Sequence, residues 1–147
     1  MSNNENNSSF ECQKLTNLID KYIYNNKIVL ITEKQVKTCS DIEKAHNIFV
    51  NQYKENNIIR LSINHVLIDL SLRQSYSDIK DIVDICLYKR YGSKNNYKQI
   101  GRNTNSYYNL NPCFYVLYPL VFINGMNIGT LQDLKKLNYR EELDILL

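Results

Sequence analysis

The chain has 147 residues, which suits one compact domain with a substantial core. Hydrophobic residues make up 44% and charged residues 22%, and the formal net charge is only +3. These are the values of an ordinary globular domain. A net charge of +3 is too small to indicate the clustered basic face that nucleic-acid binders need, so we expect no nucleic-acid partner.

The N-terminal segment is polar. Residues 1–10 are rich in Asn and Ser, lack the apolar core of a secretion signal, and predict a disordered tail before a domain over residues 11–147. The longest apolar run, residues 114–123, contains a proline and is too short to span a bilayer. We therefore expect a cytoplasmic location and no membrane partner.

The cytoplasm is a reducing compartment, so we expect the four cysteines to be free thiols. They are Cys12, Cys39, Cys86 and Cys113. No two of them have the C-x-x-C spacing, so we expect no metal site.

The first half of the chain alternates helical and strand patterns. Apolar residues recur at helical spacing over residues 11–25, and residues 28–31 form an unbroken aliphatic run typical of a strand buried on both faces. Helical spacing returns over residues 40–55, where Ser40 and Glu43 have the spacing of a capping box. A second strand is expected within residues 58–72, and residues 65–70 are the preferred position.

The second half predicts a helix, a hairpin and a last helix. Residues 77–91 have one apolar side, and Gly92 is placed to end that helix. Residues 93–111 lack periodicity and predict a long loop insertion. After a strand over residues 115–123, Asn124-Gly125 is the strongest hairpin signal. The pattern then predicts a short strand over residues 126–128 and one amphipathic helix over residues 131–147.

This order of elements indicates an α/β fold with a small mixed sheet. The C-terminal segment Tyr118-Pro-Leu-Val-Phe-Ile-Asn-Gly-Met-Asn-Ile-Gly-Thr-Leu-Gln-Asp133 resembles the glutaredoxin family. The segments around Cys12 and residues 26–31 are similar to the first helix and first strand of that family. The resemblance implies a thioredoxin-like three-layer fold, in which a mixed four-stranded sheet is flanked by helices.

The same resemblance implies a ligand site. In the family the proline is cis and turns the backbone of the preceding residue toward an extended peptide such as glutathione; here these positions are Tyr118 and Pro119. The turn that opens the last helix holds the γ-glutamyl end of glutathione. The corresponding positions are Thr130, Leu131, Gln132 and Asp133. Asp133 matches one of the family's acidic residues, whereas Gln132 replaces the other and Thr130 replaces a glycine.

The redox cysteine pair of the family is not intact. Counted without gaps from the first strand, the motif aligns with Val36-Lys-Thr-Cys39, which places valine at the nucleophile position. Valine has no nucleophilic atom, so normal thiol–disulfide exchange would be impossible. Three extra loop residues would instead make Cys39 the single nucleophile. Asp41 and Glu43 then oppose thiolate formation, and Lys34 lies one residue from the family's lysine position.

Two functions follow from these alternatives. The preferred hypothesis is a glutaredoxin-like binding or regulatory module that lacks normal oxidoreductase activity and binds glutathione or a peptide segment of a protein partner. The alternative is a monothiol-type glutaredoxin that uses Cys39 for glutathione-linked redox chemistry or for a [2Fe–2S] cluster.

Overall fold

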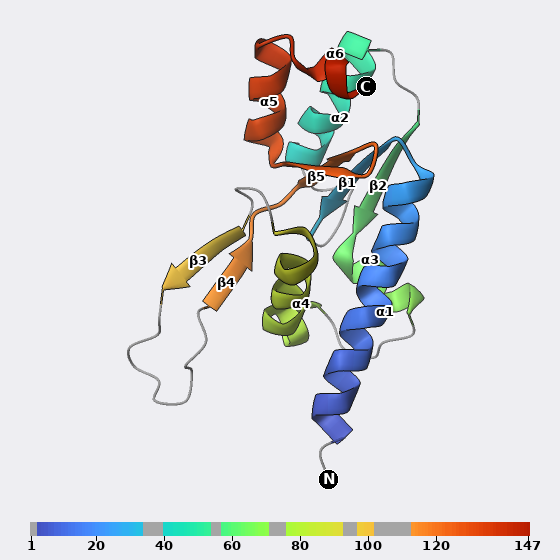
Figure 1. Ribbon diagram of the computed structural model, residues 1–147, viewed down its shortest axis with the longest axis vertical. Helices are drawn as coiled ribbons and strands as arrows, with labels where there is room; N and C mark the ends of the chain where they lie inside the picture. The colour runs from blue at the N-terminus through green and yellow to red at the C-terminus, as the bar shows by residue number, and fades with distance from the viewer. Residues whose placement is uncertain (1–2, 34–39, 54–56, 71–75, 93–96, 102–112) are drawn as a thin grey trace.

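A computed structural model describes most of the chain. The described backbone covers residues 3–33, 40–53, 57–70, 76–92, 97–101 and 113–147, and the described side chains cover residues 12–33, 40–53, 57–70, 79–92 and 116–147. In chain order the elements are α1 (Asn3–Asn25), β1 (Ile28–Thr32), α2 (Ser40–Tyr53), β2 (Ile58–Ser62), α3 (Ile63–Asp69), α4 (Tyr76–Tyr91), β3 (Tyr97–Gly101), β4 (Cys113–Val116), β5 (Leu120–Ile123), β6 (Met126–Gly129), α5 (Leu131–Tyr139) and α6 (Leu143–Leu146). Figure 1 shows their arrangement.

A mixed four-stranded sheet lies at the centre, in the order β2-β1-β5-β6. Strand β1 pairs in parallel with β2 and antiparallel with β5, and β5 pairs antiparallel with β6. All five residues of β1 are buried, as the unbroken aliphatic run predicts for a strand with neighbours and helices on every side. Asn124 and Gly125 both have positive φ at the β5–β6 turn, so the predicted hairpin is confirmed.

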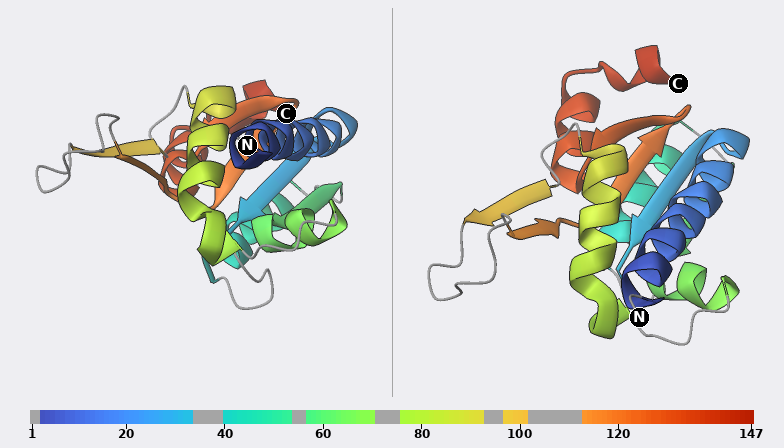
Figure 2. Two further views of the ribbon diagram at one scale, coloured as in Figure 1. Left: turned by 90° about the horizontal axis from the view of Figure 1, so that it is seen from below. Right: turned by 60° about the horizontal axis from the view of Figure 1, so that its bottom comes forward.

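Helices cover both faces of this sheet (Figure 2). Because side chains alternate along a strand, Val29 and Ile31 enter one core cluster while Ile28 and Leu30 enter the other. The first cluster joins the sheet to α1, α3 and α4, and the second joins it to α2, α5 and α6. The predicted three-layer α/β fold is therefore confirmed.

The preferred position of the second strand was wrong. Residues 65–70 lie in and just after helix α3, and the strand occupies Ile58–Ser62. Ser62 begins the helix, since its hydroxyl oxygen accepts a hydrogen bond from the His65 N–H at 3.0 Å. Val66 and Leu67 then face the core together with Ile63, at helical rather than strand spacing.

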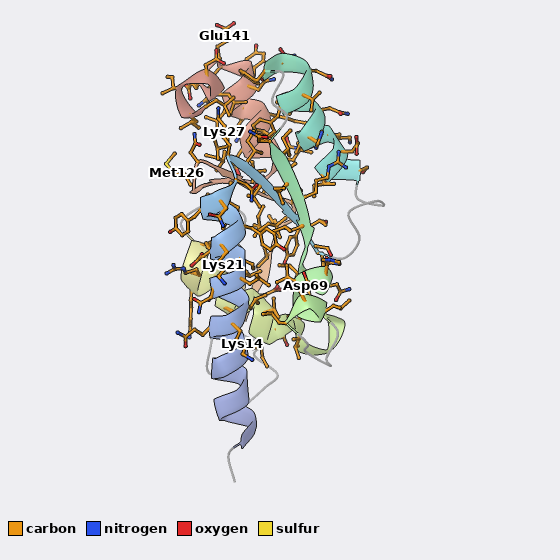
Figure 3. The ribbon with its side chains drawn as sticks, turned by 90° about the vertical axis from the view of Figure 1, so that its right-hand side faces the viewer. Lys14, Lys21, Lys27, Asp69, Met126 and Glu141 are labelled. Carbon is orange, nitrogen blue, oxygen red and sulfur yellow. A yellow bond between two sulfur atoms is a disulfide. The ribbon has the colours of Figure 1, made fainter. Side chains whose placement is uncertain are left out.

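The last helix is also not continuous. Glu141, which has a φ of +59°, separates α5 from α6 (Figure 3). The break brings Leu143 into the second core cluster, where it is fully buried. A straight helix over residues 131–147 would have carried this side chain away from the sheet.

Two segments that were predicted to be irregular contain regular structure. Helix α1 begins at Asn3, so it extends into the predicted tail; the Asn- and Ser-rich composition lowers helix propensity but does not forbid continuation of a docked helix. Within the predicted loop insertion at 93–111, residues 97–101 form β3, which pairs with β4. This hairpin projects from the body of the molecule (Figure 2). The lack of clear hydrophobic alternation in its sequence is typical of a separate two-stranded ribbon.

The expectation of free thiols was wrong for two of the cysteines. Cys12 on α1 and Cys86 on α4 form a disulfide, with their Cα atoms 5.7 Å apart. The two cysteines are 74 residues apart in sequence, and only the packing of α1 against α4 brings them together. Short spacings such as C-x-x-C therefore could not have predicted this pair. The side chains of Cys39 and Cys113 lie outside the described ones.

Candidate functional site

The predicted site residues that the structure describes, from Tyr118-Pro119 and from Thr130 to Asp133, lie at one end of the central strands. Ile31, the penultimate residue of β1, pairs with Leu120, the first residue of β5, so the end of β1 faces the segment that precedes β5. On the other side of β5, Val121 pairs with Gly129 at the end of β6. The fold therefore brings Tyr118-Pro119 and the turn at Thr130 to adjacent positions from two neighbouring strands.

Tyr118 and Pro119 form the corner before β5. The peptide bond between them is cis. Pro119 is buried, and the half-buried Tyr118 packs against the core cluster under α1 and α4. Tyr118 is thereby anchored on one side by the core.

The turn at Gly129 and Thr130 is closed by its own helix. Asp133 Oδ2 accepts hydrogen bonds from the backbone N–H of Thr130 at 2.9 Å and from the Thr130 hydroxyl at 3.1 Å. Gly129 has a φ of +117°, and a Cβ atom there would collide with the Asp133 carboxylate. Of the two residues between, Leu131 is buried in the second core cluster, whereas Gln132 is exposed.

This arrangement limits what Asp133 can do chemically. An aspartate that caps its own helix offers less acceptor capacity to the amino group of a ligand than one that is free. The position that the family resemblance assigns to ligand binding is therefore already used for capping.

The start of α2 approaches the same edge, since α2 packs on β1 and follows it in the chain. Lys34, Val36 and Cys39 lie outside the described residues, so Ser40 is the nearest described neighbour of Cys39 on its C-terminal side. Which residue aligns with the family's nucleophile consequently stays a prediction.

A charged cluster that the sequence did not indicate lies beside the first turn of α2. Arg60 on β2 donates from Nε to His46 Nδ1 at 2.9 Å and from Nη1 to Glu43 Oε2 at 2.8 Å. Burial and, next, the Arg60 charge hold the pKa of His46 below its ordinary value, while the hydrogen bond from Arg60 and its charge lower the pKa of Glu43. Arg60 stands 14 residues from His46 in a different element, so only the folded chain brings them together.

The two acidic residues of this turn both have cationic neighbours. Glu43 pairs with Arg60, and Asp41 lies 3.9 Å from the Lys44 ammonium group. Their combined repulsion of a nearby thiolate is therefore weaker than the sequence suggests.

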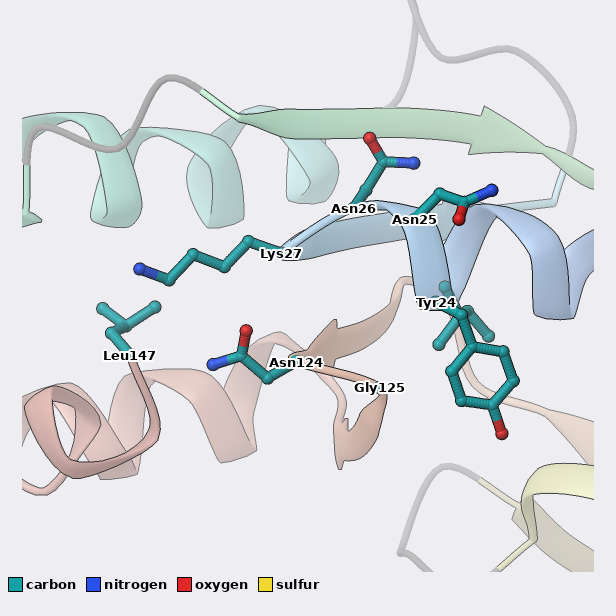
Figure 4. A pocket seen from close by; sticks show the side chains of 8 residues that line it. Tyr24, Asn25, Asn26, Lys27, Asn124, Gly125 and Leu147 are labelled. Atoms are coloured by element: carbon teal, nitrogen blue, oxygen red, sulfur yellow. The ribbon is translucent and has the colours of Figure 1, made fainter.

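A polar cavity of about 490 Å³ lies at the other end of β1. Figure 4 shows Lys27 and Leu147 facing one another across it, beside the Asn124-Gly125 turn. Asn124 donates from its side-chain amide to the carbonyl of Leu146 at 2.7 Å. None of the predicted site residues that the structure describes lines this cavity, so it is separate from the Tyr118-Pro119 corner and the Thr130 turn.

Of the comparisons with known proteins, the comparison of structures found matches and the comparisons of sequence did not. No protein-family model and no curated protein matches this sequence.

Among the helices in the described part of the chain, none has the length and apolar character needed to cross a membrane.

Solved glutaredoxin structures match along nearly the whole chain. Oxidized glutaredoxin 2 from Chlamydomonas reinhardtii has 18% identity and a TM-score of 0.55, with 92% of each chain covered. A mutated buckwheat glutaredoxin has 12% identity and a TM-score of 0.57, covering 94% of this chain and 91% of the other. A buckwheat glutaredoxin–glutathione complex has 14% identity and a TM-score of 0.53, with coverage of 92% and 91%. From its sheet order, its layers and these neighbours, this chain has the thioredoxin-like fold of the glutaredoxins.

Proposed function

We propose that this protein is a glutaredoxin-like binding module that takes glutathione or an extended peptide at the sheet edge formed by Tyr118-Pro119 and the Thr130 turn. In this proposal it does not carry out normal thiol–disulfide exchange. An extended ligand would pair with the backbone at Tyr118 and direct a carboxylate toward the start of α5.

The adjacency of the cis Tyr118-Pro119 corner and the Thr130 turn, at the ends of two neighbouring strands, carries the binding part of the proposal. Both donors of Thr130 are directed to one oxygen of Asp133, so a ligand carboxylate would meet the backbone N–H groups of Leu131 and Gln132 while Asp133 keeps its capping role. The ungapped alignment that places Val36 at the nucleophile position supports the lack of normal exchange, because it removes the attacking sulfur. Solved neighbours include a glutathione complex of the same fold, which supports glutathione as a probe.

Two measurements test this function. In a titration with glutathione followed by NMR, we expect amide signals of Tyr118, Leu131 and Gln132 to shift, while those of Asn124 and Gly125 at the opposite end stay in place. In an assay of glutathione-dependent reduction of a mixed disulfide, we expect the wild type and Cys39→Ser to be equally inactive. Activity that is lost in Cys39→Ser would contradict the proposal.

The alternative function is a monothiol-type glutaredoxin, and one observation favours it. The cations beside Asp41 and Glu43 offset the negative charges that would otherwise oppose a Cys39 thiolate next to α2. Cys39 would then act as a nucleophile or supply a protein ligand to a [2Fe–2S] cluster shared between two protomers. Anaerobic reconstitution with iron, sulfide and glutathione should give cluster absorption and a dimer that both disappear in Cys39→Ser. Their absence from the wild type, together with no Cys39-dependent reduction of the mixed disulfide, rules this alternative out.

A further inference from the structure

The disulfide between α1 and α4 has one accessible and one buried end. Cys86 lies on the inner side of α4 with 5% of its surface exposed, whereas Cys12 on α1 is half-buried. A reductant therefore reaches the bond from the Cys12 side. None of the residues proposed to bind the ligand takes part in this bond, so its role does not depend on the proposed function.

The same two helices are held together a second time, closer to the end of α1. Asp20 accepts hydrogen bonds from Arg90 Nη2 and from the Tyr91 hydroxyl, each at 2.6 Å. The Tyr91 hydroxyl also lies 3.3 Å from the carbonyl oxygen of Thr16, and its ring packs edge-on against Phe122 at 5.3 Å. These contacts do not involve either cysteine.

Among the described side chains of α1, the core contacts lie in the same half of the helix. Leu15, Ile19 and Ile23 are buried in the cluster between the sheet and α4. Among the described side chains of α1, the disulfide at Cys12 is the contact with α4 nearest the N-terminus. The outer side of the helix carries Lys14 and Lys21, two turns apart (Figure 3).

We propose that the Cys12–Cys86 bond is a redox switch that controls the N-terminal half of α1. When the bond is reduced, residues 3–14 come free of α4, while residues 15–25 stay docked through the leucine and isoleucine stripe and through Asp20. The switch therefore changes local order and leaves the domain folded.

The chemistry is an exchange with a dithiol reductant. One reductant thiolate attacks Cys12 Sγ, which forms a mixed disulfide and releases the Cys86 sulfur, and that sulfur takes a proton from solvent. The second reductant thiolate attacks the reductant's own sulfur in the mixed disulfide and releases Cys12, which is also protonated. Two electrons pass from the dithiol, which becomes a disulfide, to the Cys12–Cys86 pair, which becomes two thiols.

Hydrogen exchange of the full-length chain tests the switch. Mass spectrometry after differential alkylation reports the state of the bond in dithiothreitol buffers of graded potential, and amide exchange is measured in the same samples. On reduction we expect exchange in residues 3–14 to rise about tenfold or more, and exchange in residues 15–25 to change by less than about twofold. Cys12→Ser should show the reduced pattern even in oxidising buffer.

Cys113→Ser is the matched control, since it removes a cysteine outside the pair and should leave the oxidised pattern unchanged. Three results would each overturn the proposal: no linked Cys12–Cys86 peptide in the oxidised protein, reduction that leaves exchange in residues 3–14 unaltered, or reduction that unfolds the whole domain. The last result would make the bond a structural staple.

Discussion

At the scale of single residues, Gly129 combines two requirements that only glycine meets. Its backbone has a φ of +117°, a region that side chains with a Cβ rarely adopt, and the space a Cβ would occupy is filled by the Asp133 carboxylate. The same carboxylate caps α5 through Thr130. The candidate ligand turn and the start of the last long helix therefore depend on one glycine.

Gly129→Ala should lower the free energy of unfolding by about 2–3 kcal/mol, because backbone strain adds to displacement of the Asp133 cap. Urea denaturation measures the change. Gly125→Ala is the matched control: it has a positive φ of +83°, but a Cβ there would make only ordinary contacts with Tyr24, so its cost should be about 1 kcal/mol. Equal losses in the two variants would show that the Asp133 contact contributes nothing.

Arg60 and His46 provide a second prediction at this scale. Arg60→Gln removes a positive charge and the hydrogen bond to His46 Nδ1, so the pKa of His46 should rise toward its ordinary value of 6.5. NMR titration of the His46 ring measures this. Lys44→Gln, which removes an exposed cation from the same helix, should shift the His46 pKa less.

The sign of the effect on stability follows from linkage. Since folding lowers the pKa of His46, the unfolded chain binds more protons as pH falls below 6.5, and stability from this group is present above that pH and lost below it. Stability should therefore decline less steeply between pH 6.5 and 5.5 in Arg60→Gln than in the wild type. A steeper decline would contradict the assignment.

At the scale of elements, the break between α5 and α6 shows how a local motif overrides periodicity. The Glu142 N–H donates to the Leu137 carbonyl at 2.9 Å and the Glu141 N–H donates to the Asn138 carbonyl at 3.2 Å, which is the hydrogen-bond pattern of a Schellman ending. Glycine is the usual residue at the left-handed position, and here it is Glu141. The sequence therefore lacked the signal that would have ended α5.

Glu141→Gly should stabilise the protein by about 1 kcal/mol, since glycine adopts the left-handed conformation without steric cost. Thermal unfolding at fixed pH measures the gain. Glu142→Gly is the control, because that position has an ordinary negative φ of −92° and should gain nothing or lose stability. A loss of stability in Glu141→Gly would mean that the glutamate side chain makes a contribution larger than the backbone strain.

At the scale of the whole molecule, the Cys12–Cys86 bond closes a loop of 74 residues that contains β1, α2, β2 and α3. A cross-link over such a loop restricts the unfolded chain, and the entropy model gives about 4 kcal/mol. Cys12→Ser should therefore lower the free energy of unfolding by about 2–4 kcal/mol, measured by urea denaturation in oxidising buffer, and Cys113→Ser should not. A loss below about 1 kcal/mol in Cys12→Ser would contradict this estimate.

The same bond bears on the predicted cytoplasmic location of the protein. A reducing compartment favours free thiols, so a disulfide between α1 and α4 gives no support to the predicted cytoplasmic location, which stays a prediction.

Periodicity along the chain was sufficient for most of the elements. The helix over residues 77–91, the strand at residues 28–31 and the docked part of the first helix over residues 11–25 were predicted correctly, because each buries one stripe or a continuous run against the sheet, whereas the start of the first helix at Asn3 was not. The Asn124-Gly125 turn was correct because its two residues tolerate positive φ. Residues 65–70 were misread because a short apolar run fits a strand and a one-sided helix equally well.

The sequence by itself determined which faces are buried and where the hairpin turns, since these depend on interactions between residues a few positions apart. Only the tertiary structure decided that Cys12 meets Cys86, that Arg60 meets His46 and that α5 stops before Leu143. Burial patterns show that a face is covered but carry no information on which distant element covers it.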